Sequence, residues 1–266
     1  MNENESMPRP VALVTGAGGG LGGAIARALA ERGFDLLLND LTLSDSLQSL
    51  CIDLRSQGVR VEPMLQDISS VDRLPAFIEQ ARAVFGRLDS LINNAGVSVL
   101  SRGDILDVTP ESFDRCHGVN LRAQFFLTQA FAKSLLATPN PILGNGLRPS
   151  IVTVTTVAVD DIIGKVLAEY SISKAGLSHT VKHFASRLAA FGIDCHEVRP
   201  GMMKTSMTDS SQSKYDALIE AGCVPAYRWG ELREVAGAVG LLASGALPYA
   251  VGQVISVDGG MRMKVF

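Results

Sequence analysis

The chain has 266 residues, of which 47% are hydrophobic and 19% are charged, a composition that is ordinary for a globular protein and excludes a largely disordered one. The formal net charge of −3 gives no basic surface for nucleic acid or for an anionic membrane. Its four cysteines form no CxxC pair, which favours reduced thiols in a cytoplasmic protein over a disulfide framework or a zinc site.

The N-terminal segment 1–9 is polar and is expected to be a flexible lead-in to one domain over residues 10–266. The stretch Pro10–Ala26 carries no charge, but a glycine-rich break interrupts it before it reaches the roughly 20 apolar residues of a membrane helix. We therefore predict a strand, a tight turn and the start of a helix there, and no membrane segment.

Short apolar runs alternate with longer amphipathic stretches along the rest of the chain. The runs predict strands at Val11–Thr15, Asp35–Asn39, Val59–Leu65, Leu88–Ile92, Ser150–Thr155, Ile193–Val198 and Gln253–Val257. The amphipathic stretches predict helices at Leu21–Arg32, Val71–Phe85, Phe113–Leu136, Ser171–Ala190 and Glu231–Ala243. This alternation predicts an α/β fold with a parallel sheet that helices cover on both faces.

Two stretches are expected to be irregular. Thr138–Pro149 holds three prolines and two glycines, which predicts a loop. The region 202–228 mixes methionine, serine and threonine with a short helical pattern, as a flap over a binding site would, although an ordinary surface excursion would have the same composition.

The segment Thr15–Gly22 (TGAGGGLG) lies between a predicted strand and a predicted helix. Glycine lets the backbone turn sharply and approach a pyrophosphate, which would then lie against the N-terminus of the helix. The segment predicts a dinucleotide site, although any tight strand-to-helix turn favours glycine.

Asp40 ends the second strand, 24 residues after Gly16, near the position from which an acidic side chain binds the adenosine ribose. The alternative is an aspartate that starts the following turn. A carboxylate there would repel the 2′-phosphate of NADP, and the arginines between Gly16 and Asp40 belong to the helix body. The preferred cofactor is therefore NAD, with NADP the less favoured alternative.

Further motifs follow in order along the chain: Asn93–Gly96 (NNAG), Asn120, Tyr170-x-x-x-Lys174, Pro200-Gly201 followed by Thr205, and Val254–Gly260, which ends in DGG. With the glycine turn, they resemble the short-chain dehydrogenase/reductase family, in particular its 3-oxoacyl-ACP reductase-like members, nearly from end to end. The resemblance implies a single-domain Rossmann fold with a doubly wound, seven-stranded parallel sheet. It also implies a homotetramer built partly from the helices after Phe113 and around Tyr170.

Tyr170 and Lys174 are four residues apart, so on a helix they share one face. A phenol is a poor acid or base at neutral pH, and a neighbouring ammonium lowers its pKa. In isolation the pair would be an ordinary surface pair, but the resemblance makes Tyr170 the acid/base of a hydride transfer between the cofactor and a secondary alcohol or ketone. It further implies that Lys174 holds the nicotinamide ribose, Thr156 binds the substrate oxygen and Asn120 holds a water of a proton relay.

The resemblance also implies a set of cofactor contacts. These are Thr15, Gly16, Gly18, Gly20, Leu21, Gly22, Asp40, Asp67, Ile68, Asn94, Ala95, Gly96, Tyr170, Lys174, Pro200, Gly201 and Thr205. Asp67 would lie beside the adenine, and its alternative is the cap of a helix that begins after it.

Thr156 departs from the pattern, because the family commonly has a serine 13 residues before the tyrosine and here the interval is 14. A strict count of 13 falls on Val157, which has no hydroxyl. Side chains of adjacent strand residues point in opposite directions, so only one of Thr155 and Thr156 can face the cofactor, and we assign Thr156.

Two other pairs are not assigned to the chemistry. His179 and His183 have helical ligand spacing but lack the glutamate of HExxH, so we expect a surface or interface pair and no metal. Asp160 and Asp161 are expected to be solvated loop charges. The sequence does not identify the substrate. The walls of the substrate pocket are expected from Val97–Ser101, Ala158–Ala168 and Met202–Arg228.

Two other functions were considered. An NAD-dependent epimerase or lyase on the same fold is disfavoured by the short chain after Pro200-Gly201. A non-catalytic nucleotide-sensing protein would be expected to lose Tyr170 or Lys174, and both are present.

Overall fold

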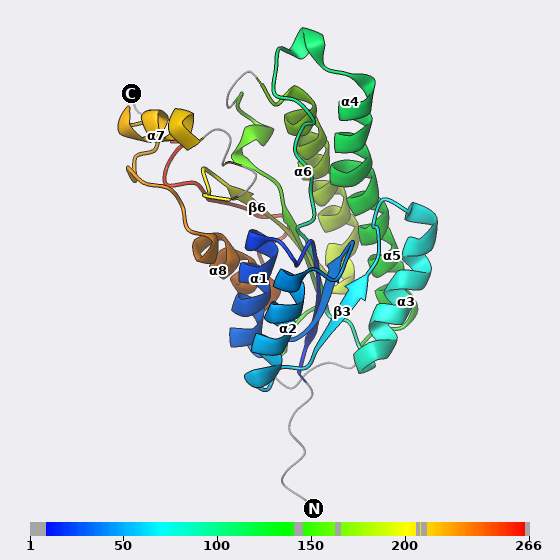
Figure 1. Ribbon diagram of the computed structural model, residues 1–266. Coiled ribbons are helices and arrows are strands. Elements are labelled where there is room, and N and C mark those ends of the chain that lie inside the picture. Colours follow the sequence, from blue (N-terminus) through cyan, green and yellow to red (C-terminus); the bar gives the residue numbers. More distant parts are fainter. Residues whose placement is uncertain (1–8, 141–145, 163–165, 206–207, 209–211, 264–266) are drawn as a thin grey trace, which may run out of the picture.

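The computed structural model describes residues 9–140, 146–162, 166–205, 208 and 212–263, and its centre is one parallel sheet of seven strands (Figure 1). The strand order is β3-β2-β1-β4-β5-β6-β7, and every pair is parallel. This confirms the predicted seven-stranded, doubly wound Rossmann architecture. The strands are β1 Val11–Thr15, β2 Asp35–Asp40, β3 Val61–Leu65, β4 Ser90–Asn93, β5 Ser150–Val154, β6 Asp194–Pro200 and β7 Val254–Val257.

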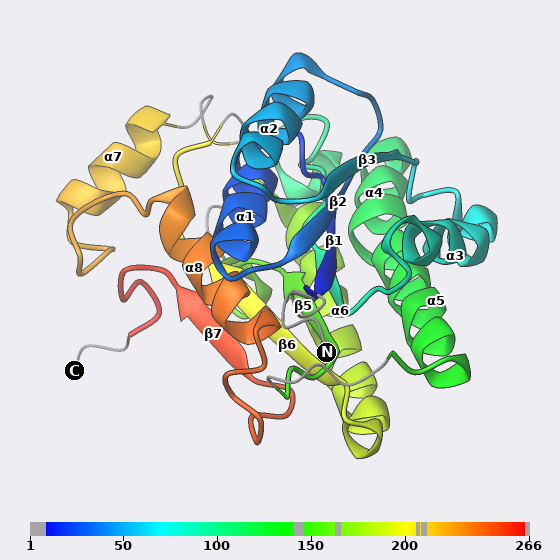
Figure 2. The ribbon, with the colours of Figure 1, turned by 90° about the horizontal axis from the view of Figure 1, so that it is seen from below.

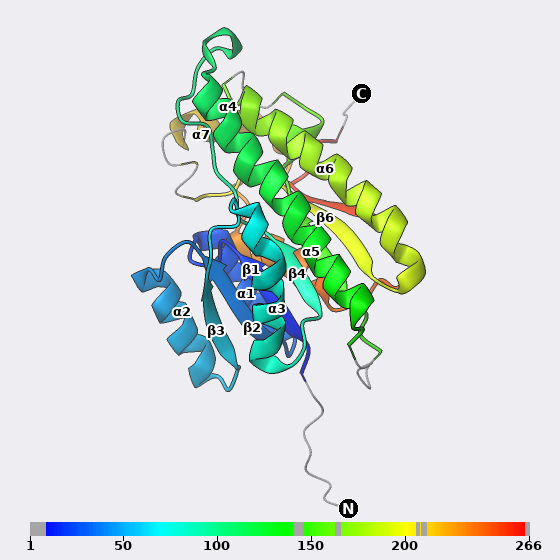
Figure 3. The same cartoon turned by 90° about the vertical axis from the view of Figure 1, so that its right-hand side faces the viewer.

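Helices cover both faces of the sheet, as Figures 2 and 3 show. The α-helices are α1 Gly20–Glu31, α2 Asp45–Ser56, α3 Leu74–Phe85, α4 Pro110–Cys116, α5 Gln124–Ala137, α6 Ala168–Leu188, α7 Gln212–Glu220 and α8 Leu232–Ala243. Five short helices complete the described chain: η1 Val71–Arg73, η2 Ile105–Asp107, η3 His117–Ala123, η4 Val157–Val159 and η5 Ala189–Phe191.

The two halves of the core are separated by the alternation of side chains along the strands. Ala12 and Val14 of β1 pack with α1, α2 and α8, whereas Val11 and Leu13 pack with α3, α5 and α6. Every residue of β1 is buried, as a strand with helices on both faces requires. The edge strand β7 differs, because its burial alternates and its Val254 is exposed.

Helix α2 is absent from the predicted helices, although its sequence carries the signal. Leu47, Leu50, Cys51 and Leu54 are buried at helical spacing, and the hydroxyl of Ser44 caps the helix by accepting from Leu47 N at 3.3 Å.

The helix predicted at Phe113–Leu136 is three consecutive segments. Between α4 and α5 lies η3, a π-helix, in which one extra residue per turn changes the direction of the side chains that follow. Asn120 lies in this segment and is fully buried.

The expected N-terminal lead-in lies outside the described residues except for Arg9. Arg9 is attached to the domain, since its Nε donates to Gly33 O at 2.9 Å and lies 3.6 Å from the Asp35 carboxylate. The loop expected at 138–149 has no regular structure where it is described, and 141–145 lie outside the described residues. Within the described chain, no helix combines the length and the apolar character needed to cross a bilayer.

Candidate active site

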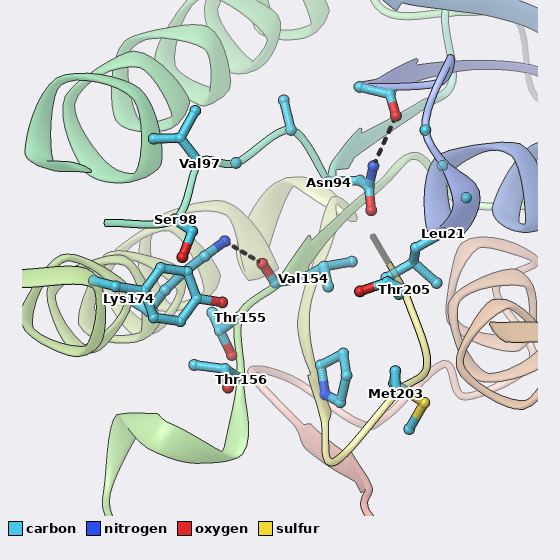
Figure 4. A pocket seen from close by; sticks show the side chains of 18 of the residues that line it. Leu21, Asn94, Val97, Ser98, Val154, Thr155, Thr156, Lys174, Met203 and Thr205 are labelled. Carbon is cyan, nitrogen blue, oxygen red and sulfur yellow. Dashed lines mark hydrogen bonds between the residues drawn. The ribbon is translucent and has the colours of Figure 1, made fainter. Parts of the chain in front are cut away.

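A cavity of about 480 Å³ opens at the carboxyl edge of the sheet, where the strand order reverses between β1 and β4. In open α/β sheets this reversal point is where ligands bind. The cavity is lined by most of the predicted site residues: Gly16, Gly20, Leu21, Gly22, Asp40, Asp67, Ile68, Asn94, Ala95, Gly96, Thr156, Tyr170, Lys174, Pro200, Gly201 and Thr205. Figure 4 shows this wall from close by. Thr15, Gly18 and Asn120 are the predicted residues that are not among its lining.

The glycine turn after β1 is closely packed against the segment after β4. A Cβ on Gly16, whose φ is +65°, would lie 2.9 Å from Ala95 Cα. A Cβ on Gly22 would lie 2.1 Å from Gly16 O. Both positions therefore require glycine for steric reasons, and the backbone of the turn and the N-terminus of α1 are left open toward the cavity, as a pyrophosphate site needs.

Thr15 holds this turn in place and does not line the cavity. Its buried hydroxyl donates to Ile92 O at 3.1 Å and accepts from the backbone N–H groups of Asn94 and Ala95, each at 3.0 Å. Asn94 returns the contact, since its Nδ2 donates to Thr15 O at 2.9 Å. Thr15 thus links β1 to the NNAG segment, and its contact with the cofactor stays a prediction.

Asp40 lies at the end of β2 and faces the glycine turn. Its carboxylate accepts from Gly18 N at 2.8 Å and from Leu41 N at 2.7 Å. A Cβ on Gly18 would lie 2.8 Å from that carboxylate, so Gly18 supports Asp40 rather than lining the cavity itself.

Asp67 follows β3 and is exposed at the rim of the cavity. Its carboxylate accepts from Ser69 N at 2.8 Å, which caps the turn before η1. Asp67 therefore caps a turn, whereas η1 itself has no side-chain cap, and Asp67 also lines the cavity as a contact with the adenine would require.

Asn120 lies behind the cavity wall. Its side chain accepts from Val97 N at 2.8 Å, donates to Val97 O at 3.0 Å and donates to Ser173 Oγ at 3.1 Å. These three bonds join η3 to the segment after β4 and to α6, the helix that carries Tyr170 and Lys174.

Lys174 is buried and donates from Nζ to the carbonyl of Val154 at 2.9 Å (Figure 4). Burial lowers the pKa of Lys174 to about 8, although the nearby Glu197 carboxylate opposes that shift.

Burial raises the pKa of Tyr170 to about 12, against a smaller lowering by the Thr156 hydroxyl. Cys116 and Tyr215 raise this pKa further and Lys174 is not among the groups that shift it, so the expected lowering by Lys174 is not seen.

The two threonines after β5 differ in surroundings. Thr155 is buried and its hydroxyl lies 2.5 Å from Glu197 Oε1. Thr156 lines the cavity together with Tyr170, and its hydroxyl accepts from Ala158 N at 3.2 Å. The Thr155 hydroxyl is directed away from Tyr170, toward Glu197 of β6.

Some lining residues were not predicted. Arg102, Val119 and Met261 line the cavity, and they come from three segments far apart in the sequence. Val119 precedes Asn120 and Met261 follows the DGG motif, so neighbouring motifs are the signals that could have found them. No local signal marks Arg102.

The expected walls are confirmed in part: Val97, Ser98, Ala158, Leu167, Met202, Thr208 and Tyr215 line the cavity. Residues 163–165, 206–207 and 209–211 of those walls lie outside the described residues.

The histidine pair and the aspartate pair that were not assigned to the chemistry differ in their contacts. His179 and His183 are exposed on α6 with ring centroids 4.9 Å apart, and the described residues include no group of three or more side chains suited to a metal. Asp160 and Asp161 are not isolated loop charges, because Arg199 and Arg262 bind them.

Comparison with known proteins agrees with this geometry. A family model described as enoyl-(acyl carrier protein) reductase matches residues 16–262. The crystal structure of 3-oxoacyl-[acyl-carrier protein] reductase from Brucella melitensis in complex with NAD is 41% identical, with a TM-score of 0.91, and the match covers 98% of this chain and 100% of that one. A blue fluorescent protein from a metagenomic library, solved with NADPH, is 29% identical with a TM-score of 0.82 over 96% of this chain and 98% of that one.

A third similarity is to 2-dehydro-3-deoxy-D-gluconate 5-dehydrogenase of Escherichia coli strain K12, at 30% identity over 96% of each chain. Both dehydrogenases and reductases are therefore among the similar proteins. The chain belongs to the short-chain dehydrogenase/reductase family of oxidoreductases, and it resembles that family's 3-oxoacyl-ACP reductases.

Proposed function

We propose that the protein is an NAD-linked oxidoreductase that transfers a hydride between nicotinamide and a secondary alcohol or ketone, with Tyr170 as the acid/base. The observation that carries the proposal is the meeting of Thr156, Tyr170 and Lys174 on one wall of the cavity that the glycine turn also lines. A proton donor, a hydroxyl beside it and a buried ammonium are the groups such a reaction requires of the protein.

The residues fit a dinucleotide, because the glycine turn and the start of α1 line the cavity without side chains that would block a pyrophosphate, and a helix N-terminus favours phosphate. When bound, the nicotinamide cofactor supplies or accepts the hydride. Asn94 stabilises the turn, and Lys174, which lines the cavity, is proposed to hold the nicotinamide ribose. Asn120, through Val97 and Ser173, positions the wall and is assigned to a proton relay.

In the reducing direction, Thr156 donates a hydrogen bond to the substrate oxygen and Tyr170 delivers a proton to it as the carbon receives the hydride. In the oxidising direction, the Tyr170 phenolate takes the hydroxyl proton. The raised pKa of Tyr170 favours the protonated phenol, which is the form that acts as the acid in reduction.

We further propose that NAD is preferred to NADP. Structures similar to this chain contain either NAD or NADPH, so family membership does not decide between them. The argument is local: the Asp40 carboxylate lines the cavity at the end of β2, where it would accept from ribose hydroxyls and repel a 2′-phosphate.

The substrate would occupy the side of the cavity away from the glycine turn. Val97, Val119, Val157, Leu167 and Met202 make much of that side apolar. The segment 202–228, which contributes Met202, Thr205, Thr208 and Tyr215 to the wall, is proposed as the substrate flap.

We also propose a homotetramer, assembled partly through α5 and α6. This follows the family resemblance and the outward-facing apolar side chains on these helices, Phe126 and Ile172.

The test begins with a panel of alcohols and ketones assayed by NADH absorbance. With the best substrate, Tyr170→Phe should retain NADH affinity and the fold but lose at least about 100-fold in kcat, because the phenyl ring fills the space without a transferable proton. Substantial residual turnover by Tyr170→Phe would show that the proton comes from another group and would contradict the proposed mechanism.

A further inference from the structure

A chain of charged and polar side chains lies behind the wall that carries Thr156, and the proposed reaction does not use it. Glu197 and Arg199 of β6 are 0% and 5% exposed. The Glu197 carboxylate is bound by Thr155 Oγ1 at 2.5 Å, Arg199 Nε at 2.6 Å and Ser178 Oγ at 2.8 Å. A buried carboxylate is stable only when its oxygens are bound in this way.

Arg199 extends this cluster toward the cavity rim. Its Nη1 donates to Asp160 Oδ2 at 2.5 Å, and Arg262, near the C-terminus, donates to the same carboxylate oxygen. Nε of Arg262 also lies 3.3 Å from Asp161 Oδ2. Burial alone would raise the pKa of Asp160, but the two guanidinium groups hold it below its ordinary value. Asp160 is therefore a charged bridge between two arginines from distant parts of the chain.

The segments that these bonds join are the ones that form the wall. Asp160 directly follows η4, whose Val157 and Ala158 line the cavity, and Arg262 directly follows Met261, which also lines it. Ser178 lies on α6, four residues after Lys174. The loop after β5 and α6 thus contact the buried ion pair directly, and the C-terminal segment is joined to it through Asp160.

We propose that Glu197 and Arg199 anchor a charged clasp, consisting of Asp160, Asp161 and Arg262, that ties the C-terminal segment to the loop after β5 and positions the substrate wall. Arg199 and Arg262 are positioning residues, because they touch the wall segments and not the reacting atoms. The consequence for substrate rests on the proposed function, whereas the clasp itself can be tested without turnover.

Substitutions in the clasp itself, which is partly exposed, test the proposal with the least risk to folding. Arg262 and Asp160 have side chains that are 27% and 47% exposed, so Arg262→Met and Asp160→Asn leave the buried Glu197–Arg199 pair intact. Substitution of Arg199 itself would leave Glu197 buried and unpaired, with a risk of misfolding.

Loosening the wall should raise the substrate KM of Arg262→Met on the order of fivefold, with kcat and the NADH Kd within about twofold of wild type. The KM of Arg262→Lys should lie between those of wild type and Arg262→Met, because an ammonium keeps the charge but lacks the two-pronged geometry of the guanidinium. Since both single changes break the same contact, their effects in the double variant Asp160→Asn/Arg262→Met should be clearly less than additive.

Hydrogen–deuterium exchange provides the readout that needs no substrate. Arg262→Met should increase exchange at residues 157–161 and 258–261, while Arg27→Met, which breaks the 2.8 Å surface pair with Asp53 on α1 and α2, should not. Unchanged exchange in these segments would overturn the clasp. Increased exchange with an unchanged KM would overturn its role in positioning substrate. Failure of the proposed function is recognised separately, by turnover that survives Tyr170→Phe.

Discussion

Two neighbouring threonines after β5 have different surroundings although their side chains are identical. The Thr155 hydroxyl is bound to the buried Glu197 carboxylate, whereas the Thr156 hydroxyl accepts from Ala158 N on the cavity wall that Tyr170 also lines. The Cα–Cβ bonds of these two adjacent residues point in different directions, so Thr155 has a structural contact and Thr156 is the candidate catalytic residue.

The threonine pair leads to a prediction with an internal control. Thr156→Val should lower kcat by roughly tenfold or more, because one hydrogen bond to the reacting oxygen is lost. Thr155→Val should lower Tm instead, since it removes a donor from a buried carboxylate, and should leave kcat close to wild type. Steady-state kinetics and thermal unfolding of both variants would check this, and the reversed pattern would show that Thr155 is the substrate-binding hydroxyl.

Asp40 supports a prediction about cofactor choice. Wild type should favour NAD over NADP by on the order of 100-fold in kcat/KM, because a carboxylate facing the 2′-phosphate is repulsive. Asp40→Asn retains an oxygen to accept from Gly18 N and removes the charge, so the preference should shrink mainly through better use of NADP. Equal kcat/KM of wild type with both cofactors would contradict the assignment of Asp40.

At the scale of elements, the turn between β1 and α1 depends on close backbone approach. Gly22 and Gly23 are adjacent in α1, yet a Cβ on Gly22 would lie 2.1 Å from Gly16 O, whereas one on Gly23 would have no neighbour nearer than 3.7 Å. Only the first of these glycines is required by the packing.

This contrast gives a matched pair of variants. Gly22→Ala should displace the turn and weaken NADH binding at least about tenfold, with a lower Tm, because the clash is with backbone. Gly23→Ala should retain NADH affinity and stabilise the protein by up to about 1 kcal/mol, since alanine is the better helix former. Fluorescence titration with NADH and thermal unfolding measure both effects, and normal binding by Gly22→Ala would contradict the packing argument.

In the whole molecule, α4 and α5 follow one another end to end through η3, and α6 runs alongside them on one face (Figure 3). Apolar side chains of these helices are exposed to solvent. Phe113 is 40% exposed, Phe126 37% and Ile172 50%. Water contact of apolar groups on neighbouring helices is unfavourable, so this face is the proposed subunit interface.

Light scattering after size exclusion should therefore give roughly four times the 28.2 kDa of one chain. The double variant Phe126→Glu/Ile172→Glu should give a smaller species, because it would bury charge in the interface. The control Ile52→Glu, at an exposed apolar position on α2, should leave the mass unchanged. A wild-type mass of one chain would contradict the tetramer.

Local patterns in the chain are enough to predict the architecture and most of the lining of the site. Strand and helix periodicity are local properties, and residues that follow parallel strands are brought to one edge of the sheet, so Gly16, Asp40, Asn94 and Tyr170 could be placed together in advance. Helix α2 was predictable in the same way, from its spacing and its serine cap.

The tertiary structure decided what depends on contacts between segments far apart in the chain. The π-helix that buries Asn120, the use of Thr15 as a link between strands, and the binding of Asp160 by Arg199 and Arg262 leave no periodic signal. The pKa of Tyr170 belongs to the same class: the spacing to Lys174 favours a lower value, but burial, which only packing creates, raises it.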